Sequence, residues 1–397
     1  MHTIVVGAGI AGLWLAEQLA RRGDRVTLLE KADYLGGRIL TSAIGLEIGA
    51  GRISTTHKHV LALLKRFDLQ TFPLPDGESW KALGDAQSQP SAFGDTWASI
   101  LTLFKEMDPN LLATHTLREL ATKSLGPELT DRILLQFGYR SEMDVLRADL
   151  AINSFMNEMD SKATFVGVKG GLSLLIRALE RACRAAGVKI QLNTTVTNVT
   201  DSYKVHTTDE TLTCDRVVLA VPVEALRHIP CTRSLKLLRH LKMEPLTRIY
   251  AKFATAWHLS NKLVTDSPLR FIIPIMPELG LVMISYTDGR DTRTFKGLKG
   301  LTLAVTIQRE LYRLFPNESV PTILWIHAYE WNNACTYWLP GSYDPATESK
   351  KALQPFPGKA IHLCNESFSL RQAWVEGSLE HAHALLANET TCADPPV

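Results

Sequence analysis

The first thirty residues constrain the fold of this chain more than any other stretch. An apolar strand at residues 4–6 runs into a glycine-rich turn at residues 7–12. A helical pattern follows, and a second apolar strand at residues 26–29 ends at Glu30. Strand, glycine turn, helix and strand in this order are typical of the βαβ unit that opens a dinucleotide-binding domain. The alternative is an ordinary βαβ unit without a ligand.

Each glycine of the turn has its own physical role. Gly7 permits the tight turn from strand to helix, and Gly9 lets the backbone approach a pyrophosphate. Gly12 lets the helix lie close to the strand. Ile10 and Ala11 lie at the helix N-terminus, where unpaired N–H groups attract phosphate. We therefore expect the pyrophosphate of a dinucleotide at this turn.

Glu30 narrows the choice of dinucleotide. It follows Gly12 by eighteen residues and closes the second strand. A carboxylate at this position accepts hydrogen bonds from ribose hydroxyls, which favours a free 2′-OH, as in FAD or NAD, over NADP.

The composition excludes several other classes of protein. The chain has 397 residues, 45% of them hydrophobic, and a net charge of +2, which gives no electrostatic footprint for nucleic acid. No apolar run approaches the roughly 20 residues of a membrane span, and no basic region precedes the first strand. Six scattered cysteines show no metal-ligand spacing. We expect a cytoplasmic protein without a metal site or disulfides.

Two downstream segments offer further contacts to a dinucleotide. The run Gly36-Gly37-Arg38 combines close backbone approach with a cation suited to a diphosphate, although a loop with a solvated arginine is the alternative. Arg52 follows Gly51 among small residues that permit close approach to a flat ligand.

The remaining chain reads as two discontinuous domains. Helical periodicity, with helices expected at 96–107, 116–136 and 147–157, interrupts the first domain. A buried strand at 216–221, stopped by a proline, is consistent with a return to it. Residues 246–290 are rich in strands, and a further strand is expected at 322–329. We predict a dinucleotide-binding domain of residues 1–55, 160–242 and 355–397, and a substrate-binding domain of residues 56–159 and 243–354.

Several landmarks, in order along the chain, resemble the flavin-containing amine oxidase family of monoamine, polyamine and L-amino acid oxidases. They are the glycine turn at 7–12 with Glu30, the runs 36–38 and 49–52, the strand at 217–222 and the C-terminal runs 365–367 and 374–377. The resemblance covers essentially the whole chain. It implies an α/β fold, in which a Rossmann-like domain of the glutathione-reductase type carries an inserted mixed domain of helices and antiparallel sheet. It also implies FAD rather than NAD.

The resemblance assigns further cofactor contacts. In this family an acid lies on the flavin ribityl chain and a helix N-terminus points at the isoalloxazine, roles that Glu366 and the run 374–377 match. Cys335 lies near the position where some monoamine oxidases attach flavin covalently, but we expect non-covalent binding. The predicted cofactor-binding residues are Gly7, Gly9, Ile10, Ala11, Gly12, Glu30, Lys31, Gly37, Arg38, Gly51, Arg52, Val196, Glu366 and Val375.

Within the family, the chain most resembles bacterial L-amino acid oxidases of the L-tryptophan oxidase type, through residues 47–54, 267–270 and 285–288. In these enzymes an arginine at the position of Arg52 holds the substrate carboxylate. A guanidinium pairs bidentately with a carboxylate, most strongly in a dry pocket. The alternative is that Arg52 binds FAD phosphate or an internal acid.

The implied reaction is hydride transfer from the substrate Cα to flavin N5, followed by hydrolysis of the imine to a 2-oxo acid and ammonia. Oxygen then reoxidises the flavin and yields hydrogen peroxide. Alternatives are an amine or polyamine oxidase, and a dehydrogenase or low-turnover flavin-binding protein that uses another acceptor. The expected partners are an amino acid or amine substrate and O2 or another electron acceptor. We expect neither nucleic-acid binding nor a membrane span, and a homodimer is compatible with the sequence.

Two departures from the family pattern affect this interpretation. Arg248 occupies the position of a family lysine that holds a water near flavin N5, which makes an acceptor other than O2 plausible. Trp374 matches one wall of the amine-binding aromatic pair, but the other wall aligns with Cys335 or Thr336. Tyr139 and Glu142 belong to a region that lines pockets in this family, or else lie on a helix surface.

Two further residues, Tyr286 and Asp288, match substrate-site positions, and a buried Asp288 would recognise a polar or cationic side chain unless it is a turn residue. The predicted catalytic residues are Arg52, Arg248, Tyr286, Asp288 and Trp374.

Overall fold

In the computed structural model, the N-terminal stretch forms the βαβ unit that its glycine pattern predicts. The strands β1 and β2 are parallel and in register from the pair His2 and Arg25 to the pair Val6 and Leu29. The bounds are β1 (His2–Val6), α1 (Ile10–Arg21) and β2 (Arg25–Leu29). The structure describes residues 1–75, 77–157, 164–257, 259 and 261–391. The predicted domain boundary at 159/160 and Cys392 lie outside these residues.

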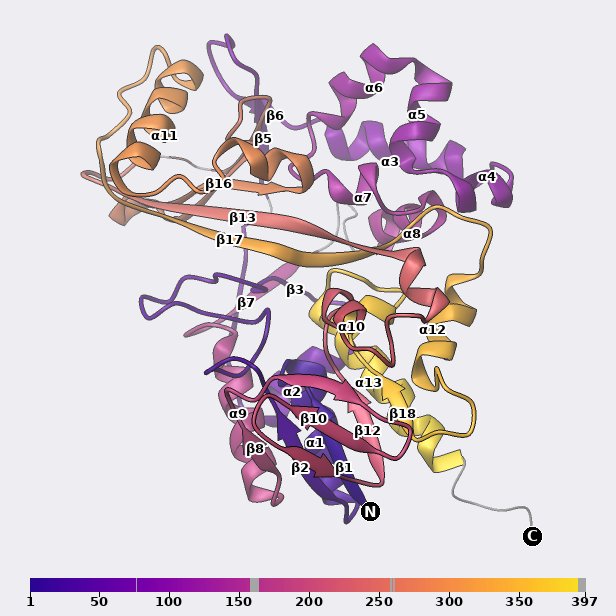
Figure 1. Ribbon diagram of the computed structural model, residues 1–397. Helices are drawn as coiled ribbons and strands as arrows, with labels where there is room; N and C mark the ends of the chain where they lie inside the picture. The colour runs from indigo at the N-terminus through magenta and orange to yellow at the C-terminus, as the bar shows by residue number, and fades with distance from the viewer. Residues whose placement is uncertain (76, 158–163, 258, 260, 392–397) are drawn as a thin grey trace.

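This unit is the centre of a parallel sheet in the lower half of the molecule (Figure 1). Its described strands follow the order β18-β12-β1-β2-β8, and every pairing is parallel. All three sequence segments that we assigned to the first domain contribute strands to this sheet. Helices α9 and α13 pack against α1. The bounds are α9 (Ser173–Ala185), β8 (Lys189–Gln191), β12 (Arg216–Leu219), β18 (Ile361–Leu363) and α13 (Val375–Thr391).

Two small antiparallel sheets flank this domain. One has the order β11-β10-β9, and the other has the order β3-β7-β4. Helix α2 packs against α13 because Glu376 accepts hydrogen bonds from the backbone N–H groups of His59 (2.8 Å) and Val60 (2.9 Å). The predicted boundary places α2 in the second domain, and the domain division stays a prediction. The bounds are β3 (Ile53–Ser54), α2 (Lys58–Arg66), β4 (Thr71–Pro73), β7 (Phe165–Val168), β9 (Val196–Val199), β10 (Lys204–Thr207) and β11 (Thr211–Thr213).

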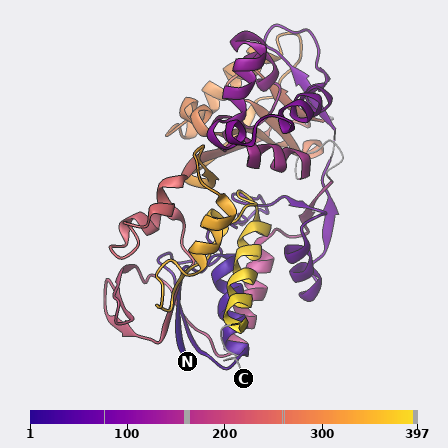
Figure 2. The same ribbon diagram turned by 90° about the vertical axis from the view of Figure 1, so that its right-hand side faces the viewer.

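The second half of the molecule is built on a mixed sheet with the described order β17-β13-β16-β15-β14-β5-β6. Figure 1 shows its two long strands, β13 and β17, running between the helices above and the first domain below. The view in Figure 2 separates the same two halves. The bounds are β5 (Glu78–Lys81), β6 (Gln89–Pro90), β13 (Leu241–Phe253), β14 (Lys262–Thr265), β15 (Phe271–Met276), β16 (Leu281–Asp288), α11 (Gly300–Leu314) and β17 (Ile323–Trp338).

The strand predicted at 322–329 is too short. β17 continues to Trp338 because it pairs with β13 along almost its whole length, with register shifts that absorb the irregular residues. Trp338 is fully buried at its end.

The helical part corrects one further prediction. The expected helix at 116–136 is two helices, because Gly126 has a φ of 80° and Pro127 lacks the N–H that a continuous helix requires. The bounds are α3 (Phe93–Lys105), α4 (Pro109–Thr114), α5 (Leu117–Leu125), α6 (Pro127–Leu134), α7 (Ser141–Asp144) and α8 (Ala148–Asn157). The other described elements are α10 (Val223–His228), η1 (Lys236–His240), η2 (Pro277–Leu279), η3 (Gly289–Thr294), α12 (Pro345–Leu353) and η4 (Glu366–Phe368).

Candidate active site

The glycine turn leaves the N-terminus of α1 open. Gly9 is the N-cap residue, and neither a capping side chain nor an acidic residue in the first turn occupies this end of the helix. A Cβ atom on Gly9 would meet nothing within 4 Å, whereas one on Gly12 would lie 2.0 Å from the carbonyl oxygen of Gly7. The two glycines therefore serve different purposes: Gly12 is required by packing, and Gly9 borders open space beside the N–H groups of Ile10 and Ala11.

A second glycine loop, which α1 and β2 separate from the first in the sequence, lies against it. Gly36 donates a hydrogen bond from its N–H to the carbonyl of Ala8 (2.9 Å) and forms a bridge with Gly9. A Cβ on Gly37 would lie 3.5 Å from the Cα of Gly9. The backbones of the two loops therefore lie side by side, and both can approach a bound diphosphate.

Glu30 is held beside the same turn. Its two carboxylate oxygens accept hydrogen bonds from the N–H groups of Ala8 (2.8 Å) and Ala32 (3.0 Å). Lys31 is exposed, and Val196 is half-buried on β9. The acid is thus fixed at the carboxyl end of β2, where a ribose would be bound in this type of fold.

Arg38 and Glu366 form an ion pair (Nη1–Oε2 2.8 Å). Arg38 also donates to the carbonyl of Ala334 (2.7 Å). Glu366 accepts from the backbone N–H groups of Thr336 (3.2 Å) and Ala373 (2.9 Å). This buried carboxylate therefore ties the glycine loop, β17 and the segment that leads into α13 at Val375.

The open helix end, the paired glycine loops and the acid after β2 fit FAD. The predicted residues that would hold it are the glycines of the two loops, Glu30, Arg38 and Glu366. Gly51 is also predicted to contact FAD, and a Cβ atom at this position would clash with the Glu47 side chain at 2.4 Å. Cys335, the nearest candidate for covalent attachment, is a free thiol whose pKa is raised by burial. Such a thiol is a poor nucleophile.

Arg52 lies inside a box of aromatic rings. Its guanidinium carbon is 4.6 Å from the ring centre of Phe165, 5.3 Å from that of Trp374 and 5.5 Å from that of Tyr139. Its Nη1 donates a hydrogen bond to the Tyr139 hydroxyl (3.3 Å). Within the described residues, no carboxylate forms an ion pair with Arg52. A half-buried cation between aromatic rings, with no ion-pair partner among the described residues, is suited to an anion from outside the chain.

The aromatic rings around Arg52 also pack against one another. Trp374 stacks on Phe165 with ring centres 5.9 Å apart and meets the buried His57 edge-on at 5.1 Å. Burial lowers the pKa of His57 to about 4, so this imidazole is neutral at physiological pH. Phe165, on β7, is a site residue that the sequence analysis missed; no local motif distinguishes it from a core phenylalanine.

Arg248 and Tyr286 extend the site along the sheet. Arg248 is buried and donates hydrogen bonds to the carbonyl of Glu47 (2.7 Å) and to the Tyr286 hydroxyl (3.2 Å). Tyr286 meets Tyr139 edge-on at 5.0 Å, and Tyr139 in turn contacts Arg52. The structure thus connects Arg52, Tyr286 and Arg248, which the sequence analysis predicted separately.

Asp288 has a different setting from the one expected. Its two carboxylate oxygens accept hydrogen bonds from the N–H groups of Arg140 and Ser141, each at 2.8 Å. The buried carboxylate therefore satisfies the N-terminus of the short helix α7. Its predicted role in recognising a substrate side chain stays a prediction.

Glu142, on α7, carries an unsatisfied carboxylate. One oxygen accepts a hydrogen bond from the Tyr337 hydroxyl (3.1 Å), while Oε2 is buried and has no hydrogen-bond partner in the described part of the chain. Burial, and then the charge of Asp288, raise the pKa of Glu142 to about 7. The sequence analysis left two alternatives for this residue, a pocket lining or a helix surface, because a four-residue helix shows no periodicity that would mark an inward face; the structure buries its carboxylate.

The raised pKa predicts how stability depends on pH. Folding favours protonated Glu142, so its contribution to stability is complete below the ordinary pKa of 4.5 and is lost as pH rises through about 7. Thermal unfolding between about pH 5 and pH 8 should show a smaller loss of stability at high pH for Glu142→Gln than for the unsubstituted protein. Glu180→Gln, in a surface ion pair of α9, is the control. Identical pH profiles for Glu142→Gln and the unsubstituted protein would contradict this assignment.

Comparison with a solved structure supports the fold. The chain superimposes on a cofactor-binding redesign of putrescine oxidase with a TM-score of 0.78 and 18% sequence identity, over 99% of both chains. This likeness confirms the predicted α/β fold class.

Sequence comparison then identifies the family. The model of the flavin containing amine oxidoreductases matches residues 10–384, and the chain belongs to that family. The predicted family, FAD as the cofactor, and an oxidoreductase acting on CH–NH2 groups are thereby confirmed.

Three relatives with named activities share between 22% and 28% of their residues with this chain. An L-amino-acid oxidase of Mus musculus is 28% identical over 371 residues, which cover 77% of this chain and 57% of the mouse protein. An L-amino-acid oxidase of Naja atra is 24% identical, over 95% of this chain and 85% of the relative. The flavin-dependent L-tryptophan oxidase RebO of Lentzea aerocolonigenes is 22% identical over 96% of each chain.

Metal sites and membrane-spanning helices are both absent from the described residues. No group of three or more His, Cys, Asp and Glu side chains is placed to hold a metal ion there. None of the helices in the same residues has the length and apolarity to cross a membrane.

Proposed function

We propose that the protein catalyses the FAD-dependent oxidative deamination of an L-amino acid to a 2-oxo acid, with ammonia and hydrogen peroxide as the other products. The observation that carries this proposal is Arg52, a guanidinium held by Tyr139, Phe165 and Trp374 without an anionic partner among the described residues. An amine substrate lacks the carboxylate that this cation would bind. The L-amino-acid oxidases among the relatives support the same substrate class.

The protein residues then bind and orient the substrate. Arg52 pairs with the carboxylate, and its aromatic walls exclude water, which strengthens the pair. Trp374 supplies one flat wall for the remainder of the substrate. Bound FAD supplies the oxidation, because flavins accept hydride and return electrons to O2. Holding the substrate in one orientation lowers the entropic part of the barrier.

Anaerobic mixing with a substrate panel tests the proposal. The panel pairs each L-amino acid with its decarboxylated amine, so that the two members differ only in the carboxylate. We expect at least one L-amino acid to bleach the flavin absorbance faster than its amine. Bleaching by amines alone would favour an amine oxidase, and bleaching by no member would refute the proposed reaction.

Admission of air to the reduced protein tests the acceptor. We propose O2, and the expected products are oxidised flavin and one equivalent of hydrogen peroxide for each flavin reduced. Arg248, at the position of the family lysine, is the observation that favours the rival, a dehydrogenase with another acceptor. The cytoplasmic location and the homodimer stay predictions.

A further inference from the structure

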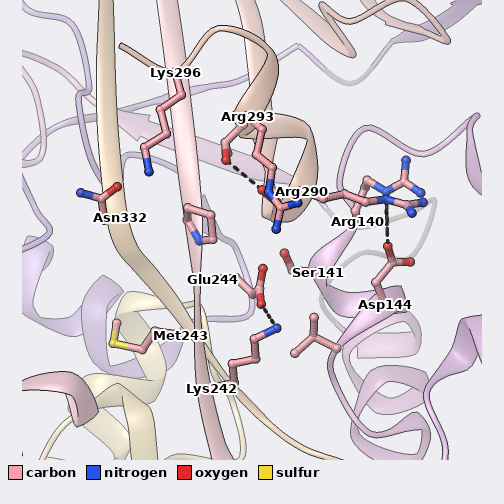
Figure 3. A pocket seen from close by; sticks show the side chains of 14 residues that line it. Arg140, Ser141, Asp144, Lys242, Met243, Glu244, Arg290, Arg293, Lys296 and Asn332 are labelled. Carbon is pink, nitrogen blue, oxygen red and sulfur yellow. Dashed lines mark hydrogen bonds and ion pairs between the residues drawn. The ribbon is translucent and has the colours of Figure 1, made fainter. Parts of the chain in front are cut away.

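A basic hollow lies beside α7, and its lining includes Ser141 and Asp144 but not Glu142. Its volume is about 680 Å³, within the range of small-molecule sites. Figure 3 shows side chains from α7, the start of β13, η3 and β17 converging on it. Neither the proposed reaction nor the cofactor uses these side chains.

Positive charge prevails in this hollow. Five cationic side chains and two carboxylates line it, a net charge of +3. Glu244 pairs with Lys242 at 2.6 Å, and Asp144 pairs with Arg140 at 3.3 Å and more loosely with Arg290 at 3.8 Å. The cationic residues are Arg140, Lys242, Arg290, Arg293 and Lys296.

Two of these cations differ from the other three in their pairing. Within the described part of the chain, neither Arg293 nor Lys296 forms an ion pair, and both are exposed at the hollow. Like charges gathered without anions raise the energy of the protein unless an anion binds. They therefore point to a ligand with several negative charges.

The floor of the hollow holds a buried hydroxyl. Ser141 is only 1% exposed, and among the described residues its Oγ has no hydrogen bond of regular geometry, although it lies near enough to the Asp288 carboxylate to act on the pKa of that group. A Cβ on Gly289 would lie 3.1 Å from that Oγ and 3.4 Å from Oε2 of Glu244, so the glycine keeps the floor open. A ligand oxygen in the hollow would compete with Asp288 for this hydroxyl.

We propose that this hollow is a second binding site, for a small molecule that carries two or three negative charges on phosphate or on neighbouring carboxylates. Arg293 and Lys296 would neutralise the charge, and Ser141 would donate to one oxygen. Guanidinium groups bind phosphate and carboxylate with the same fork geometry, so the shared chemistry is a compact oxyanion. Val145, Met243 and Pro245 offer apolar contact to the rest of the molecule.

Isothermal titration of the FAD-loaded protein with inorganic phosphate, and separately with citrate, tests the proposal. Ionic strength is held constant with NaCl, because non-specific charge effects follow total salt. We expect saturable binding of at least one probe. Tighter binding of phosphate points to a phosphate ester, and tighter binding of citrate points to a polycarboxylate. The absence of saturable heat with both probes would overturn the site.

Three variants test whether the binding takes place in the hollow. Arg293→Gln with Lys296→Gln should weaken binding about tenfold for each cation removed. Ser141→Ala should weaken it without a change of charge. Lys299→Gln, an exposed lysine outside the hollow, should bind as the unsubstituted protein does. Equal affinity in the double variant and in Lys299→Gln would refute the proposal. Flavin absorbance and unfolding temperature confirm that each variant is folded.

Discussion

Replacing Arg52 with alanine should lower kcat/KM for the preferred L-amino acid about 100- to 1,000-fold. The guanidinium lies among the three rings of Tyr139, Phe165 and Trp374, where a carboxylate pair is poorly screened by water. The truncation removes the cation and leaves the substrate carboxylate in apolar surroundings. Steady-state rates of peroxide formation measure the effect.

The controls separate a carboxylate contact from general damage to the site. For the matching decarboxylated amine, Arg52→Ala should change kcat/KM by much less, because that substrate has no anion to lose. Arg52→Lys should recover only part of the activity, since an ammonium lacks the planar fork. Arg184→Ala, in a surface pair with Glu180, controls for the loss of an arginine. Equal losses for the amino acid and the amine would rule out the assigned role.

Substitution of Gly12 by alanine should destabilise the protein by about 3 kcal/mol and abolish the retention of FAD. The added Cβ would lie 2.0 Å from the carbonyl oxygen of Gly7, and this atom belongs to the backbone and cannot rotate away. The helix α1 would have to separate from β1, which moves its N-terminus. Thermal unfolding and the flavin content of the purified protein measure both effects.

The matched variant is Gly9→Ala, in the same turn. Its φ of −70° suits alanine, and its Cβ would meet nothing within 4 Å. We expect the unfolding free energy of the apoprotein to stay within about 0.5 kcal/mol. FAD should nevertheless bind more weakly, because the methyl group would occupy the space through which the backbone approaches the pyrophosphate. If both variants retained FAD equally, the glycine turn would not be the phosphate site.

The short helices show where sequence reasoning was limited. The break between α5 and α6 follows from Gly126 and Pro127. A glycine followed by a proline ends a helix on local grounds, so this break could have been predicted from the sequence. The roles of Asp288 and Glu142 could not be obtained in this way. Their carboxylates differ only in which groups the fold brings to them: two backbone N–H groups for Asp288 and a single hydroxyl for Glu142.

Sequence alone determined the βαβ unit and its glycine turn, because their requirements are local. Strand, glycines and helix are contiguous, and the contact between Gly12 and Gly7 is decided by backbone geometry over six residues. Family landmarks extended this to FAD and predicted a role for Arg52. Only the tertiary structure decided the surroundings of Arg52, since they come from a loop, from β7 and from the segment before α13. Contacts between such distant segments depend on how the two halves of the molecule pack, which no local pattern encodes.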